Sequence, residues 1–387
     1  MTPDQHPAPA LAASFFFWAS LFIYAPILPA YAAARGASLG LVGVIVGAYG
    51  VTQGLLRLPI GIATDRWRCP RGVVLTGLAA IALGGILLAL ANTAFLLLGG
   101  RVLAGAGAAT WVALLVLAVG TYPAGKLTEA ISAVAVAATL AEVGAVLAGG
   151  LLAEYVGWTA PFYASAVLAA LGLAPALRLR PPVVPESEGM SWARVTRAAR
   201  RPRLLVTSAL TALVTLTIYV TTYGFVPILA LERGATRADL GVLATLAQAG
   251  FAFGALITAR AARRVTPPTI LMAGAGLVAL SAALVPVVSG MLLLQATQAL
   301  GGVGRGLVNP IAAMLVLSGV PESERSTTMG IYQMGWSTGI FLGPPLAGWL
   351  AEVWGLPGAF LTGAAASVVA AALGGWLWLK DRGPTSR

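Results

Sequence analysis

Long apolar stretches alternate with short polar segments along the whole chain. About 20 apolar residues suffice for a helix to cross the hydrocarbon core of a bilayer. Twelve stretches come close to or exceed this length: residues 11–33, 39–63, 72–92, 94–119, 128–154, 159–177, 204–231, 240–262, 269–289, 291–316, 327–352 and 356–379. We therefore expect an all-α membrane protein with twelve transmembrane helices.

The two halves of the chain repeat each other at an offset of 198 residues. Residues 150–157, GLLAEYVG, match residues 348–355, GWLAEVWG, and residues 35–37 match residues 233–235. A period this long is not that of a solenoid and indicates a duplicated domain. In an apolar chain, two halves of like orientation are typical of transporters built from parallel repeats.

The longest polar segment, residues 178–203, joins the two sets of six stretches. We divide the chain into a six-helix half over residues 1–177, this linker, and a second six-helix half over residues 204–387. Ser191 is placed to cap a short basic helix, with Trp192 on its apolar side, that would lie on the inner headgroup surface. The alternative is a plain linker whose arginines set the topology.

Composition and charge agree with a membrane protein. The chain is 58% hydrophobic and 10% charged, outside the range of soluble domains. With both termini in the cytoplasm, 18 of the 24 basic residues fall in inside loops or the tail, and only Arg35, Arg233 and Arg237 lie outside. The net charge of +11 is therefore a topogenic signal, and no stretch remains to form a nucleic-acid-binding domain.

Charged residues inside the predicted spans are few. Glu142 is the one acid near the middle of a span, and Arg57, Arg101 and Arg305 are the basic ones. A charge at the bilayer centre costs at least about 2.5–3.5 kcal/mol on insertion scales, so each is a functional candidate. Arg57 is the weakest, because it lies near the inner end of its helix and can extend toward the cytoplasm.

Several motifs resemble those of the major facilitator superfamily of secondary transporters. The loop after the second span reads GIATDRWR over residues 61–68, similar to the family's Gly-x-x-x-Asp-Arg signature. The fourth span carries RVLAGAGAA over residues 101–109, and PILP over residues 26–29 is similar to a motif of bacterial twelve-span drug:proton antiporters. The resemblance covers the chain and implies that fold, with both termini cytoplasmic.

Two departures from the family pattern bear on the direction of transport. The antiporter motif of the fifth helix normally has Gly-Pro before Gly-Gly, but here Ala145-Val146 precedes Gly149-Gly150. This motif is linked with export in the family, so its erosion leaves uptake open. In the second half, Arg263-Arg264 stands where Asp65-Arg66 stands in the first.

The resemblance implies a conformational latch formed by Gly61, Asp65, Arg66 and Arg68. We expect the Asp65 carboxylate to face the N-terminal end of the eleventh helix near Thr327, where the helix dipole stabilises it by about 0.3–1 kcal/mol. Neighbouring arginines would add charge-assisted hydrogen bonds. Such a contact must be modest, so that substrate or proton can release it. The alternative is a solvated loop charge.

Glu142, with Arg101, is our candidate for proton coupling. A carboxyl in a poorly solvated cavity has a raised pKa, and a nearby arginine lowers it. The alternative is that Glu142 permanently neutralises Arg101 or Arg305. With two candidate partners and one acid, at least one arginine should lack an acidic partner.

The first, fourth, seventh and tenth helices line the cavity in this family. The candidate substrate-binding residues on them are Arg305, Tyr24, Trp111, Tyr219, Tyr223, Gln298 and Asn309. Aromatic faces with a few polar groups are typical of a small-molecule site. The surplus arginine favours an anion, a zwitterion or a polar solute bearing carboxylate or phosphate.

We expect a multi-pass protein of the cytoplasmic (inner) membrane that exports a drug or metabolite in exchange for protons by alternating access. We expect a monomer that is not an enzyme and has no cofactor or metal. The sequence contains no nucleotide-binding Gly-x-x-x-x-Gly-Lys-[Ser/Thr] motif. The alternatives are a proton symporter for an anionic or sugar-like nutrient, a lipid or lysolipid flippase, and a non-transporting sensor.

Overall fold

The structure is a computed structural model that describes residues 6–67, 69–123, 125–180, 196–198 and 200–381. Within this part of the chain, all regular structure is helical. The first repeat contains α1 (Ala8–Phe22), α2 (Leu28–Ala34), α3 (Leu39–Trp67), α4 (Pro70–Ala89), α5 (Ala94–Ala108), α6 (Trp111–Val119), α7 (Leu127–Tyr155) and α8 (Ala160–Leu177). The possible linker helix after Ser191 falls mainly outside the described residues.

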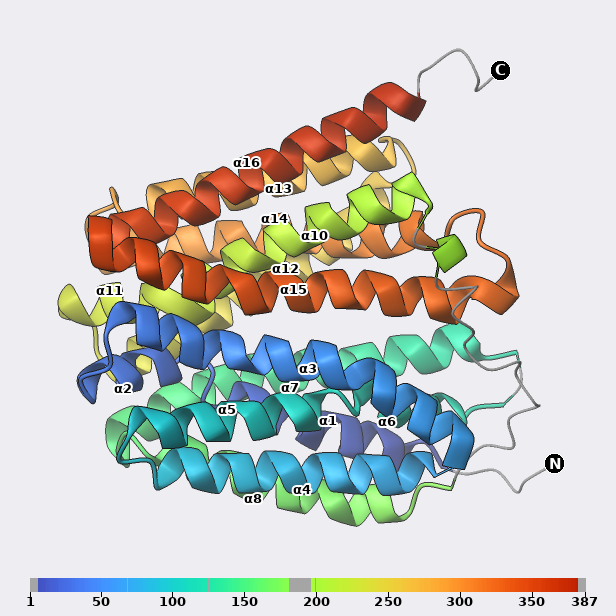
Figure 1. Cartoon of the computed structure of the whole chain (residues 1–387), viewed down its shortest axis with the longest axis horizontal. Helices are drawn as coiled ribbons and strands as arrows, with labels where there is room; N and C mark the ends of the chain where they lie inside the picture. Colours follow the sequence, from blue (N-terminus) through green and yellow to red (C-terminus); the bar gives the residue numbers. More distant parts are fainter. Residues whose placement is uncertain (1–5, 68, 124, 181–195, 199, 382–387) are drawn as a thin grey trace. The chain divides into compact units, whose positions relative to one another are not determined.

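The second repeat follows the same order, except that the single helix α14 stands in place of α5 and α6 and a π-helical turn precedes α11 (Figure 1). Its elements are α10 (Pro202–Val220), the π-helical turn η1 (Thr221–Phe225), α11 (Val226–Glu232), α12 (Arg237–Ala261), α13 (Pro267–Leu284), α14 (Met291–Leu317), α15 (Glu322–Trp354) and α16 (Leu356–Asp381). The offset seen in the sequence carries over to the helices: α2 and α11 have equivalent bounds, and so do the starts of α3 and α12.

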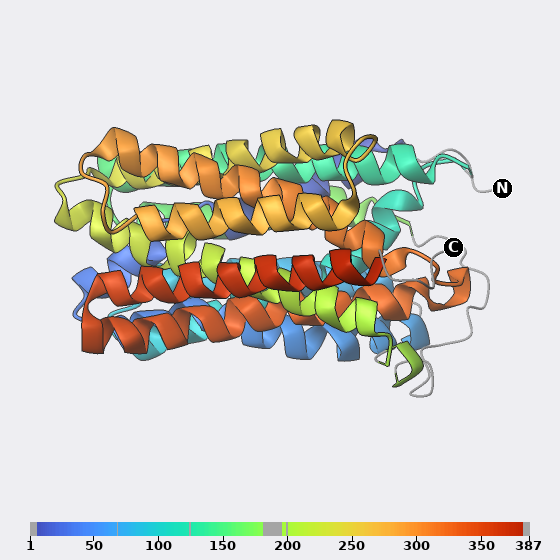
Figure 2. The same cartoon turned by 90° about the horizontal axis from the view of Figure 1, so that it is seen from above.

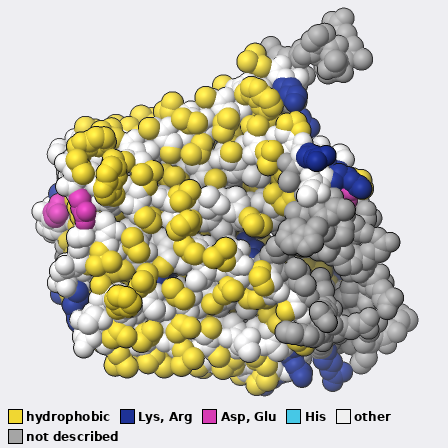
Figure 3. Space-filling view, in the orientation of Figure 1, with side chains coloured by type: hydrophobic (Ala, Val, Ile, Leu, Met, Phe, Trp, Pro, Cys, Tyr) yellow, Lys and Arg dark blue, Asp and Glu magenta, His cyan; other side chains and the backbone are white. Residues whose placement is uncertain are grey.

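Ten helical segments of the described chain are long and apolar enough to cross a membrane, and α1 is a shorter apolar helix. Large apolar side chains are exposed on several of these helices, including Phe95 at 85% and Leu140 at 62%. In Figure 3, apolar side chains cover the length of the helices and most charged ones lie toward the helix ends. Soluble proteins rarely expose apolar surfaces of this extent to water, so these surfaces are typical of a multi-pass membrane protein.

Contacts between Cα atoms divide the chain into two compact units. Unit 1 consists of residues 1–35, 51–189 and 236–241; unit 2 consists of residues 36–50, 190–235 and 242–387. In each unit the long helices run along roughly one direction (Figures 1 and 2). The helices α3 and α12 each contribute residues to both units.

Proline and threonine break the helices at defined places. The first helix of each repeat is interrupted before a proline, Pro29 in α2 and Pro227 in α11. Because Pro227 cannot donate its i−4 hydrogen bond, the preceding turn widens into η1. Between α5 and α6, the Thr110 hydroxyl donates to the Gly107 carbonyl at 2.7 Å, a contact that bends helices.

The repeated Arg-Gly pair closes the turn after the broken first helix. Gly36 and Gly234 have φ of 83° and 84°, the left-handed conformation that ends helices. Arg35 donates to the Ala91 carbonyl at 3.2 Å, beyond the end of α4, and Arg233 donates to the Val288 carbonyl at 2.9 Å, beyond α13. These arginines therefore pair backbone carbonyls of the turns that follow α4 and α13.

The repeated glutamate caps a helix in each unit. In unit 1, Glu154 accepts a hydrogen bond from the Arg237 backbone N–H at 2.8 Å. In unit 2, Glu352 accepts one from the Gly40 N–H at 2.9 Å. In both cases the carboxylate lies at the first turn of α12 or α3, where the helix dipole favours negative charge. Arg237 also donates to the Ala153 carbonyl at 3.1 Å. The three arginines that depart from the charge bias thus each bind a carbonyl.

Repeated glycines allow the close approach that these caps require. A Cβ atom at Gly43 would lie 2.2 Å from the Pro344 carbonyl oxygen, and one at Gly241 would lie 2.8 Å from that of Val146. Val146 and Pro344 are equivalent positions of the two repeats. The glycines at 335, 339 and 343 instead face α10 of their own repeat. Those three therefore serve packing within the second repeat.

Candidate functional site

Two of the candidate residues of unit 1, Tyr24 and Arg101, meet at the break between α1 and α2. Tyr24 lies in this break with none of its surface exposed, and its hydroxyl accepts a hydrogen bond from Arg101 Nη1 of α5 at 3.3 Å. The Arg101 guanidinium carbon lies 5.9 Å from the centre of the Tyr24 ring. Phe162 of α8 packs on the same ring at 5.6 Å. The structure therefore brings Tyr24 and Arg101 together.

Trp111 belongs to an aromatic cluster with α1. It begins α6, and its ring lies 4.9 Å from that of Trp18 and 5.7 Å from that of Phe17. Trp111 directly follows Thr110, at the break between α5 and α6. Its ring contacts are those of a packing residue, and the residue is half-buried.

Glu142 lies near the middle of α7 and is half-buried. It belongs to the same unit as Arg101. Arg57, in α3, is only 9% exposed, and Gln53 one turn before it is 1% exposed. The Arg57 side chain is therefore enclosed by protein.

In unit 2, Arg305 contacts two side chains of α12. Its Nη2 donates to Gln248 Oε1 in a short hydrogen bond, and the guanidinium carbon lies 4.2 Å from the centre of the Phe251 ring. Glycines bring the two helices together, because a Cβ at Gly302 would lie 2.1 Å from the Ala247 carbonyl oxygen. Gln248 is 1% exposed.

Two other polar residues of α14, Gln298 and Asn309, lie along the same face as Arg305. Gln298, two turns before Arg305, accepts a hydrogen bond from the Thr222 hydroxyl of η1 at 2.8 Å. Asn309 follows Arg305 by one turn, and its Oδ1 is buried without a hydrogen-bond partner among the described residues. Spacings of seven and four residues place all three on one side of a helix.

Tyr219 and Tyr223 pack against each other where α10 passes into η1. Their ring centres are 5.4 Å apart. Tyr223 is 4% exposed and Tyr219 is half-buried. Tyr223 lies in η1, at the break in the first helix of the second repeat, and Tyr24 lies at the equivalent break in the first repeat.

The predicted latch is only partly described. The backbone of α3 includes Gly61, Asp65 and Arg66, but the side chains of Asp65 and Arg66 lie outside the described residues, as does Arg68. A Cβ at Gly61 would meet nothing within 4 Å. Because α15 begins at Glu322, Thr327 lies in its second turn and not at its N-terminus.

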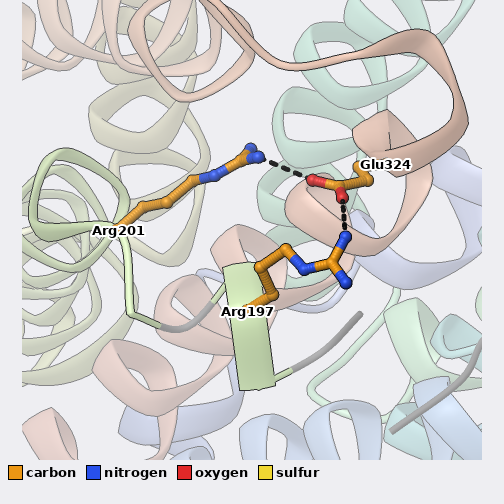
Figure 4. A network of polar contacts seen from close by, with 3 residues as sticks. All are labelled: Arg197, Arg201 and Glu324. Carbon is orange, nitrogen blue, oxygen red and sulfur yellow. Dashed lines mark hydrogen bonds and ion pairs between the residues drawn. The ribbon is translucent and has the colours of Figure 1, made fainter. Parts of the chain in front are cut away.

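An ion-pair cluster that the sequence analysis did not single out lies at the start of α15 (Figure 4). Glu324 accepts from Arg201 Nη2 at 2.6 Å and from Arg197 Nη1 at 3.2 Å. The Glu324 side chain is 10% exposed, whereas those of Arg201 and Arg197 are 31% and 68% exposed. Two of the basic residues before the second repeat therefore bind a nearly buried carboxylate.

Comparison with known proteins gives a consistent picture. The model of the Major Facilitator Superfamily matches residues 10–227 and 208–387. The inner membrane transport protein YajR of Escherichia coli (strain K12) is 27% identical over 365 residues, which is 90% of this chain and 78% of that protein. A chloramphenicol resistance protein of Streptomyces lividans is 28% identical over 66% of each chain.

Solved structures share the fold at low identity. A point mutant of the nucleoside transporter NupG superposes with a TM-score of 0.84 at 15% identity, covering 96% of this chain and 99% of that one. A bacterial homologue of the human lysosomal transporter Spinster, in an inward-facing and occupied conformation, superposes with a TM-score of 0.79 at 16% identity, covering 98% of each chain.

Proposed function

Because the chain belongs to the Major Facilitator Superfamily, we propose that it is a secondary transporter that exports a small molecule in exchange for protons. The observation that supports this function is the set of polar and charged side chains at mid-helix positions of apolar helices. Arg101 meets Tyr24 in unit 1, and Arg305 meets Gln248 in unit 2. Charged side chains within membrane helices are energetically costly and mark substrate or ion pathways.

The proton-coupling group in this proposal is Glu142. It is the one acid near the middle of a span, and it shares unit 1 with Arg101. A carboxyl that alternates between a dry surrounding and an arginine changes its proton affinity in each cycle. Each proton that moves inward through 100 mV supplies about 2.3 kcal/mol for transport.

The proposed direction is export. The PILP motif of residues 26–29 supports it, and one relative carries the name chloramphenicol resistance protein. Because α7 has Ala145-Val146 where the export motif has Gly-Pro, uptake by symport is the alternative. We also propose that both termini are cytoplasmic, that the protein acts as a monomer, and that Asp65, Arg66 and Arg68 form a latch after Gly61.

Everted membrane vesicles provide the test of coupling and direction. Respiration acidifies their interior, and a pH-sensitive dye reports proton release when organic anions, organic cations, sugars or lysolipids are added outside. An exporter that exchanges its substrate for protons gives dye recovery with at least one class. We expect Glu142→Gln to abolish this response and to retain exchange driven by a substrate gradient alone.

Glu129→Gln is the matched control, because Glu129 lies on the same helix with its side chain 58% exposed. It should behave as the wild type. If proton-driven transport and exchange are both unchanged in Glu142→Gln, Glu142 is not the coupling group. If substrate addition produces a proton signal only in right-side-out vesicles, as co-uptake, the protein is a symporter.

A further inference from the structure

The charge of Arg305 is not compensated by any acid at its depth in unit 2. The sequence of this unit contains five acids, and all of them lie at the ends of helices: Glu232, Glu322, Glu324, Glu352 and Asp381. Arg305 lies in the middle of α14, about 18–21 Å from either end of that helix. No ion pair joins it to a carboxylate among the described residues.

The contacts that Arg305 does make hold the guanidinium without neutralising it. The Gln248 side-chain oxygen takes one hydrogen bond, and the Phe251 ring covers one face. The Arg305 Nε is buried without a hydrogen-bond partner in the described structure. A guanidinium has five N–H donors, so several remain to be satisfied. An oriented cation with unused donors is suited to bind an anion.

We propose that Arg305 binds an anionic group of the transported molecule, a carboxylate or a phosphate, and that Gln248 positions the guanidinium for it. The inference rests on the proposed transport function and names its substrate class. Phe251 excludes water from one face of the cation, which strengthens the interaction with the ligand. Asn309, one turn away with its buried Oδ1 unsatisfied, adds a group that can accept a hydrogen bond from a hydroxyl or protonated atom of the same ligand.

Gln248→Glu separates this role from simple packing. The substitution is nearly isosteric and places a carboxylate against Arg305, so that an internal ion pair replaces the ligand. Gln248→Leu instead preserves the positive charge and removes the hydrogen bond. If Gln248 only supports the fold, Gln248→Leu is the more damaging change. If Arg305 binds an anion, Gln248→Glu is the more damaging change for binding and the less damaging one for stability.

The measurement is the binding of charge-matched probes to the purified full-length protein in detergent. Benzoate, phenyl phosphate and succinate are the anions; benzamide and benzylammonium carry a neutral and a cationic head group on the same ring as benzoate. We expect at least one anion to bind and to raise the thermal midpoint. Arg305→Gln and Gln248→Glu should each weaken that binding by about tenfold or more, and Arg305→Lys by less.

Arg260→Gln is the control, because it removes the same charge from an exposed position near the end of α12. Its anion affinity should equal that of the wild type. The proposal is overturned if none of the three anions binds, if benzamide or benzylammonium binds as well as benzoate, or if Gln248→Glu keeps wild-type affinity. Because the assay involves neither protons nor direction, its failure is distinguishable from a failure of proton-coupled export.

Discussion

At the residue scale, the Glu324 carboxylate binds two arginines at the start of α15. Its side chain is 10% exposed and accepts hydrogen bonds from Arg201 at 2.6 Å and Arg197 at 3.2 Å. We expect Glu324→Gln to lower the free energy of unfolding by about 1–3 kcal/mol, because charge-assisted hydrogen bonds are lost and Arg201 stays partly buried. Thermal unfolding of the purified protein measures the change.

The two arginines should differ in the same experiment. Arg201→Ala should cost more than Arg197→Ala, because the Arg201 side chain is 31% exposed and that of Arg197 is 68% exposed. Arg325→Ala is the control: this residue is adjacent to Glu324 but exposed, and its loss should change little. Equal effects of Glu324→Gln and Arg325→Ala would contradict a specific role for the cluster.

The sequence was sufficient to single out Arg305 but not its partner. An arginine in the middle of an apolar stretch is conspicuous, because the cost of burying it is large. Gln248 is an ordinary polar residue until α12 and α14 are brought together by their glycines, and that approach is a tertiary contact. The same holds for Glu324, whose arginine partners lie more than a hundred residues earlier.

At the scale of elements, the duplicated glutamates are helix caps. Glu154 accepts from the Arg237 N–H and Glu352 from the Gly40 N–H. We expect Glu154→Ala to lower the free energy of unfolding by about 0.5–2 kcal/mol, the usual cost of an N-terminal cap. Glu352→Ala should act in the same direction but less, because Glu352 is exposed and Glu154 is half-buried.

Glu129→Ala is the matched control for the cap in α7. Glu129 forms an exposed pair with Lys126 at 3.0 Å, and such pairs contribute little. Thermal unfolding of the three variants should therefore rank Glu154→Ala as the least stable. A Glu154→Ala variant as stable as Glu129→Ala would show that the α12 N-terminus does not need the carboxylate.

Helix positions were predictable, and helix interruptions were not. Apolar stretches of the right length placed the expected helices within a few residues, because hydrocarbon thickness fixes the length of a span. The breaks at Thr110 and at η1 arise from single hydroxyl and proline effects on the backbone, which leave the apolar pattern unchanged. The sequence repeat shows Glu154 and Glu352 as equivalent residues. Their capping role is visible only in the structure, where each lies at the first turn of another helix, α12 or α3.

At the scale of the whole molecule, the charge bias predicts how the chain lies in the membrane. Arg35, Arg233 and Arg237, the exceptions, donate to carbonyls or stack on aromatic rings, so their positions have a structural cause. We propose that the other basic residues of the loops act as a topogenic signal. The proposed topology, with cytoplasmic termini, predicts on which side of the membrane each end of α12 lies, and this can be tested directly.

The single cysteine makes that test simple. In a Cys69→Ser background, Glu232→Cys and Ala262→Cys place one exposed thiol on each side of α12. This helix has 25 residues, about 37 Å, enough to cross a hydrocarbon core of about 30 Å. A membrane-impermeant maleimide should label Glu232→Cys in intact cells and Ala262→Cys only after permeabilisation. The reverse pattern would invert the topology, and labelling of both in intact cells would mean that α12 does not cross the membrane.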